Sequence, residues 1–209
     1  MVPEKTVPAV PAPASVPVAR HPRPGQLAAM ISSTALDLPE HRRLVHQACL
    51  DAGVFPIGME QLSARDSTGI AVSLEMVDRA DIYLGVYGPR YGWVPDGKDV
   101  SITEMEFDHA IARKNEGKLR EILVFTAHKD HAFTVEDMEA DAIAQEKLRK
   151  FKARAAHGRV RREFKNAEEL HRLVASSLRS YRARSEASGL EDPSRSTAAF
   201  HHHSCGHCH

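Results

Sequence analysis

The segment Ser32-Ser33-Thr34 has the residue types of a small anion site. It follows the apolar run 27–31 and precedes a stretch with helical signals, so we expect it at a turn between a strand and a helix. Hydroxyl and backbone N–H groups at such a turn can hold a phosphate or a carboxylate. The alternative is a polar turn that satisfies its own backbone. Both interpretations stay open.

Glu104 and Glu106 form a second group with chemical potential, because a carboxylate can stabilise a positive centre or form a covalent intermediate. Both lie near the start of a helix that Ser101 is expected to cap. Two positions apart on a helix, their side chains point about 200° from each other, so only one can face a given pocket. The alternative for each is an acid placed in the first turn by the helix dipole.

Three loop residues complete the candidate ligand-binding set. Glu60 follows the second expected strand and either lines the same cleft or is a surface acid. Arg90, together with Tyr87, can grip an anionic ligand because a guanidinium fork pairs with phosphate. Alternatively, the glycine-rich loop that holds them is a partner-binding surface.

The C-terminal tail is rich in imidazole and thiol groups, which are good ligands for zinc, nickel and copper. Two of its cysteines have the C-x-x-C spacing of half a zinc site, but no second half-site is present. The alternative is a tail with no physiological metal. The candidate zinc ligands are His201, His203, Cys205, His207 and Cys208.

Composition excludes several classes of protein. The 28 basic and 28 acidic residues balance, which gives no strong nucleic-acid signal. No run of 18 apolar residues is present, so no membrane-spanning helix is expected. Prolines break the N-terminal apolar stretch, which therefore does not fit a signal peptide. A cytoplasmic location is expected.

These candidate residues need a scaffold, and the pattern of apolar runs supplies one. Five short apolar runs alternate with five helical patterns, which favours a parallel sheet with helices on both faces. We predict a single doubly wound α/β domain of the flavodoxin/TIR-like type, with a five-stranded sheet in the order 2-1-3-4-5. Asp37 is expected to cap the first helix, with Glu40 completing a capping box. The predicted strands are 27–31, 54–57, 82–86, 122–125 and 160–164, and the predicted helices are 37–52, 70–77, 101–115, 141–156 and 166–181.

The sequence divides into three parts. Residues 1–24 hold seven of the twelve prolines and are predicted to be a disordered arm. Residues 25–183 form the α/β domain, and residues 184–209 are predicted to be a disordered tail that ends in the His/Cys-rich segment.

Several blocks of the α/β domain resemble a known family of TIR-like domains of unknown function. Ile31-Ser32-Ser33-Thr34, Asp37-Leu38 and Glu40 follow its signature I-S-S-T-x-x-D-L-x-x-E-R, with His41 intervening before Arg42. The segments 56–60, 81–92 and 101–107 resemble its later blocks in order. Such domains usually precede NACHT or other STAND-type NTPase modules. The resemblance therefore implies a signalling or assembly role, with self-association or a STAND-type ATPase as partner. No Walker-type loop occurs in this chain.

The start of the 101–115 helix also resembles that of nucleoside deoxyribosyltransferase-like and TIR-related enzymes. In those enzymes a Glu three residues after a Thr and four before an Ala acts on the anomeric carbon of a ribosyl group. Thr103 and Ala110 identify Glu106 as the matching residue. This resemblance implies an alternative function as a nucleotide N-glycosidase with NAD as substrate. No cofactor is required by either interpretation.

Overall fold

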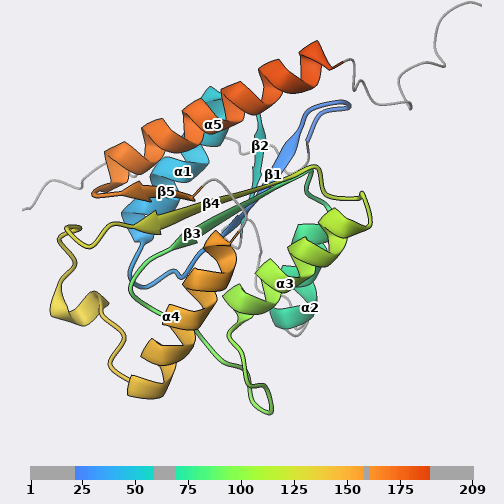
Figure 1. Ribbon diagram of the computed structural model, residues 1–209. Helices are drawn as coiled ribbons and strands as arrows, with labels where there is room; N and C mark the ends of the chain where they lie inside the picture. The colour runs from blue at the N-terminus through green and yellow to red at the C-terminus, as the bar shows by residue number, and fades with distance from the viewer. Residues whose placement is uncertain (1–21, 59–68, 158–160, 189–209) are drawn as a thin grey trace, which may run out of the picture.

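The computed structural model describes residues 22–58, 69–157 and 161–188. Its centre is a parallel sheet of five strands in the order β2-β1-β3-β4-β5 (Figure 1). This is the predicted doubly wound α/β arrangement with the predicted strand order. The strands are β1 (Ala28–Ser32), β2 (Phe55–Ile57), β3 (Ile82–Tyr87), β4 (Glu121–Ala127) and β5 (Arg161–Phe164).

Helices cover both faces of the sheet (Figure 1). On one face α1 (Pro39–Asp51) and α5 (Ala167–Ala187) lie side by side. The other face carries α2 (Gly69–Asp78), α3 (Ile102–Asn115) and α4 (Ala142–Ala156). A single 3-10 turn, Val135–Asp137, lies between β4 and α4. Helix α5 runs to Ala187, past the expected domain boundary at residue 183.

The two central strands, β1 and β3, are buried along their whole length. Parallel strands with helices on both sides must be apolar on both sides, which is why they read as short continuous apolar runs. Alternate residues enter different cores: Met30 and Tyr83 pack under α2 and α3, whereas Ile31 and Leu84 pack under α1 and α5. Ser32 is the first polar residue of β1, and it ends the strand.

The starts of the helices explain where the loops turn. Ser101, Asp141 and Asn166 each accept a hydrogen bond from a backbone N–H in the first turn of α3, α4 and α5. Capping by these side chains satisfies donors that have no partner within the helix.

Helix α1 starts differently, and the prediction that Asp37 caps it is wrong. Leu38 occupies the cap position and makes no capping bond through its side chain. The Asp37 carboxylate instead accepts a hydrogen bond from the backbone N–H of Arg90, at 3.3 Å. A Cβ atom at Gly88 would collide with this carboxylate, so the glycine lets the loops after β1 and β3 meet.

None of the helices in the described ranges combines the length and the apolar character needed to cross a membrane.

Candidate functional site

Glu106 lies on the side of α3 that faces the sheet, and only 4% of its surface is exposed. Ser32, at the carboxyl end of β1, donates a hydrogen bond to its Oε2 at 2.5 Å. Ser73 of α2 donates to its Oε1, also at 2.5 Å. A strand and two helices therefore converge on one carboxyl group, at the sheet edge where ligands bind in this class of fold.

Two tyrosines of β3 extend this arrangement. The hydroxyls of Tyr83 and Tyr87 are 3.1 Å apart, and Tyr83 also hydrogen-bonds with the side chain of Ser32. Gly85 lies between the tyrosines on the same side of the strand, and a Cβ atom there would collide with the Tyr87 hydroxyl. The glycine thus makes room for a buried chain of polar groups, the hydroxyl cluster: Tyr87, Tyr83, Ser32, Glu106 and Ser73.

Burial controls protonation in the hydroxyl cluster. Burial raises the pKa of Glu106 above its ordinary value, although hydrogen bonds from Ser32 and Ser73 and the charge of Arg42 oppose this. Burial also raises the pKa of Tyr83 well above its usual range, and the neighbouring Tyr87 and Glu106 add to the effect. A carboxyl group with a raised pKa can act as an acid, and its ionised form can stabilise an oxocarbenium-like centre.

The three residues of the predicted anion turn do not converge. Ser32 faces α2 and α3, whereas Ser33 faces α1, where Arg42 donates hydrogen bonds to its backbone oxygen at 2.8 Å and its hydroxyl at 2.6 Å. Thr34 lies against the loop after β3, where its methyl group would be 3.0 Å from a Cβ atom added to Gly92. The three side chains of the turn therefore make three separate contacts.

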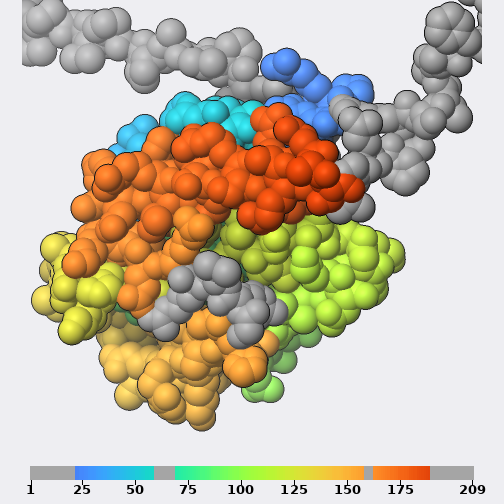
Figure 2. All heavy atoms as spheres, turned by 45° about the horizontal axis from the view of Figure 1, so that its top comes forward, coloured from blue at the N-terminus to red at the C-terminus, as the bar shows by residue number. Residues whose placement is uncertain are grey.

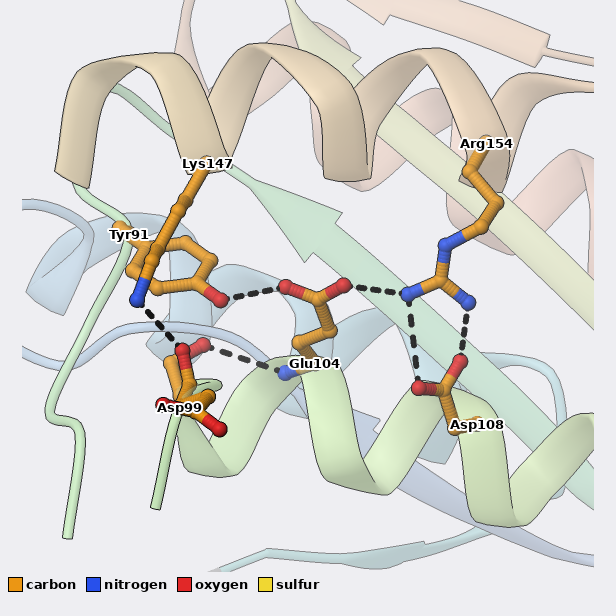
Figure 3. A network of polar contacts seen from close by, with 7 residues as sticks. Tyr91, Asp99, Glu104, Asp108, Lys147 and Arg154 are labelled. Carbon is orange, nitrogen blue, oxygen red and sulfur yellow. Dashed lines mark hydrogen bonds and ion pairs between the residues drawn. The ribbon is translucent and has the colours of Figure 1, made fainter. Parts of the chain in front are cut away.

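Glu104 lies on a different side of α3 from Glu106 and faces α4 (Figure 3). Tyr91 donates its phenolic O–H to Glu104 at 2.5 Å. Arg154 of α4 donates to both Glu104 and Asp108, one turn apart on α3. Lys147 adds a hydrogen bond to the backbone oxygen of Asp99 at 2.6 Å. The structure thus gives Glu104 the position of a link between α3 and α4.

Tyr87 and Arg90 take separate places. Tyr87 is 2% exposed, and its ring packs 4.7 Å from that of Phe151 of α4. The guanidinium of Arg90 donates to the backbone oxygens of Glu136 and Asp137, which fastens the connection between β4 and α4 to the loop after β3. Tyr87 therefore belongs to the hydroxyl cluster, and Arg90 to the loops above it.

The remaining candidates lie outside the described residues. These are Glu60 and the proposed zinc ligands His201, His203, Cys205, His207 and Cys208. Within ranges 22–58, 69–157 and 161–188, no group of three or more His, Cys, Asp or Glu side chains is placed to hold a metal ion.

Sequence reasoning missed Ser73 and Tyr83. Ser73 carried a usable signal, because it stands three residues after Ile70 and four before Val77, on the apolar stripe of α2. A polar residue at such a position needs a buried partner. Tyr83 looked like an ordinary aromatic of a buried strand, and only the fold shows where its hydroxyl points.

The comparison with curated proteins gave no match. A family model described as a domain of unknown function (DUF4062) matches residues 28–179. This range contains all five strands together with Ser32, Ser73 and Glu106. Because the match covers well over half of the 209 residues, the chain belongs to the DUF4062 family.

Proposed function

We propose that this protein is a TIR-like signalling domain of STAND-NTPase systems that acts by assembling with itself or with a STAND-type ATPase in the cytoplasm. The main support is the distribution of exposed apolar side chains. In the described part of the chain six large apolar side chains are exposed, and five of them belong to the loops and helix start at the carboxyl edge of the sheet. They are Leu36, Trp93, Val135, Met138 and Ile143.

Polar contacts hold these loops together, so the five side chains belong to one end of the domain. Arg90 joins the loop after β1, through Asp37, to the connection before α4, through Glu136. The backbone N–H of Tyr91 donates to Glu139 at 3.1 Å. Clustered exposed apolar side chains on a soluble domain are typical of protein interaction sites.

Light scattering over a range of protein concentrations tests this proposal. We expect concentration-dependent association, weakened in a Trp93→Ser/Met138→Ser variant. Lys150→Ser is the control, since this polar side chain is exposed on α4, two turns after Ile143. A protein that stays monomeric and does not co-purify with a co-expressed STAND-type ATPase would contradict the proposal.

A second candidate, an N-glycosidase acting on NAD, is favoured by the hydroxyl cluster. Ser32 and Ser73 hold the Glu106 carboxyl in one orientation at the carboxyl edge of the sheet. Such a carboxylate suits attack on, or stabilisation of, the anomeric carbon as the bond to nicotinamide breaks. Since Glu106 is 4% exposed, substrate would reach it only after neighbouring side chains move.

Nicotinamide release from NAD tests the second candidate, in monomeric and in associated samples. We expect Glu106→Gln to abolish release and Glu104→Gln, the control from the same helix, to retain it. Absence of turnover in both samples of the parent protein would exclude this function for NAD.

A further inference from the structure

Residues 135–143, which we call the acidic segment, combine exposed apolar side chains with negative charge. Val135 is 86% and Ile143 69% exposed. The segment contains four acidic residues and no basic one: Glu136, Asp137, Glu139 and Asp141. Arg90 contacts its backbone and offsets part of this charge. The result is an apolar surface with a negative rim at the carboxyl edge of the sheet.

A surface of opposite sign lies on the α1/α5 side. Residues 172–184 of α5 contain four exposed arginines, and Glu186 in the following turn pairs with Arg182 at 3.6 Å and offsets part of this charge. Arg179 and Arg182 are three positions apart, so they lie within about 60° of each other around the helix axis. Leu50 of α1 is 48% exposed and directly precedes Asp51, which the charge of Arg179 reaches. We call Leu50, Arg179 and Arg182 the arginine face.

Local contacts define the position of the arginine face. Arg182 donates a hydrogen bond to the backbone oxygen of Ala52 at 2.8 Å. The pKa of Asp51 is lowered mainly by hydrogen bonds from Gln47 and His171, and the charge of Arg179 adds to this effect. Asp51 is already engaged by those two side chains. The arginine face therefore lies where α1 ends, next to the start of β2.

The two surfaces lie at opposite ends of the sheet. The acidic segment follows the carboxyl end of β4, whereas α1 ends at the amino edge, before β2 begins. In Figure 2 the yellow connection before α4 and the red end of α5 are at opposite sides of the molecule. One molecule cannot bring these surfaces together, but two copies can.

We propose that copies of this chain associate head to tail, with the acidic segment of one copy on the arginine face of the next. This inference rests on the proposed assembly function and specifies its partner as a second copy. Val135 and Ile143 would pack on Leu50, within a rim of paired charges. Because the contact joins two different surfaces and leaves one of each free, it repeats without closing unless the rotation forms a ring.

Changes of charge on each surface test the contact in the full chain. One variant carries Glu136→Lys and Ala140→Lys, which reduces the net charge of the acidic segment from −4 to −1, and the other carries Arg179→Glu and Arg182→Glu. We expect each variant alone to need at least about a tenfold higher concentration than the parent for half-maximal association. An equimolar mixture should recover pairwise association, because the unchanged arginine face of the first variant then meets the unchanged acidic segment of the second. Added salt should weaken the association of the parent.

An Arg149→Glu/Lys150→Glu variant is the matched control, since it makes the same charge change as the arginine variant on exposed α4 residues. It should associate like the parent, and thermal unfolding should show that all variants fold. If the parent associates but the changes of charge have no effect, the head-to-tail contact is wrong while assembly stands. If the parent is monomeric at every concentration, this inference fails, and the proposed function then depends on the ATPase partner alone.

Discussion

Each face of the sheet carries an ionisable cluster near the carboxyl edge, one buried and one partly buried, and the two are built differently. On the α2/α3 face the hydroxyl cluster surrounds the acid Glu106 with hydrogen-bond donors. On the α1/α5 face His41 of α1 and His131 of the connection after β4 meet head-on, with their Nε2 atoms 2.8 Å apart. Phe133 and Phe164 surround this pair, which we call the imidazole cluster.

The imidazole cluster, like the hydroxyl cluster, disfavours the charged form of its ionisable groups. Burial and the neighbouring His131 lower the pKa of His41 to about 4, against the opposing effect of Glu168, Glu40 and Asp137. Burial also lowers the pKa of His131. An Nε2–Nε2 hydrogen bond needs one neutral acceptor, so double protonation would break it.

Burial favours the neutral form in both clusters. Because one cluster holds an acid and the other holds bases, the two make stability depend on pH in opposite directions. The acid has a raised pKa and the bases have lowered ones. The serine hydroxyls can donate hydrogen bonds to the ionised form of Glu106, whereas the phenyl rings around the two histidines offer an imidazolium no hydrogen bond. The hydroxyl cluster is therefore the one suited to a change of protonation during chemistry.

We expect the largest loss of stability from removing Phe164, one of the two phenyl rings that pack against the imidazole cluster. Phe164 is fully buried, so Phe164→Ala should lower the free energy of unfolding by about 3–5 kcal/mol, measured by urea denaturation. The neighbouring Lys165→Ala should change it by less than about 0.5 kcal/mol, because Lys165 is exposed. A loss below about 1 kcal/mol for Phe164→Ala would show that the rings do not form a packed wall.

Removing Glu106, the acid at the centre of the hydroxyl cluster, should lower the free energy of unfolding by less than Phe164→Ala does. Glu106→Ala leaves two buried serine hydroxyls without their acceptor and should lower the free energy of unfolding by about 2–3 kcal/mol. Glu106→Gln keeps the shape and one acceptor oxygen, and it should cost about 1 kcal/mol. Equal losses in the two variants, again from urea denaturation, would mean that the serines are not held by the carboxyl group.

The two clusters should change stability with pH in opposite directions. The folded-state pKa of His41 is lowered from 6.5 to about 4, so its contribution is present above pH 6.5 and lost as the pH falls toward 4. The folded-state pKa of Glu106 is raised, so its contribution is present at low pH and lost as the pH rises through that value. In His41→Gln the free energy of unfolding, measured against pH, should change less over the acidic range than in the parent protein. A parent-like slope in His41→Gln would contradict the assignment.

We expect the smallest loss of stability from removing a single serine hydroxyl of the hydroxyl cluster. Ser32→Ala and Ser73→Ala should each lower the free energy of unfolding by about 0.5–1.5 kcal/mol. Because both bind Glu106, the double variant should deviate from the sum of the two by about 0.5 kcal/mol or more. Strict additivity in this cycle would show that the two serines do not share a network.

The fold was readable from the sequence because its strands are short apolar runs bounded by turn residues, as in 82–86. The contact between Ser32 and Glu106 agrees with the rule that strand ends and helix starts share one edge of the sheet. The assignment of Asp37 failed because its carboxylate met a distant loop, and local pattern carries no information on that contact. The His41–His131 pair was out of reach for a similar reason, since a helix and a loop 90 residues apart supply its members.

The link made by Arg154 has a mechanical consequence. Helix α4 begins within the acidic segment and, about 18 Å further along, is tied by Arg154 to the helix that carries Glu106. A rigid helix transmits displacement along its axis. Displacement of Ile143 by a partner would therefore move α4 and, through Arg154, shift α3 without passing through the sheet.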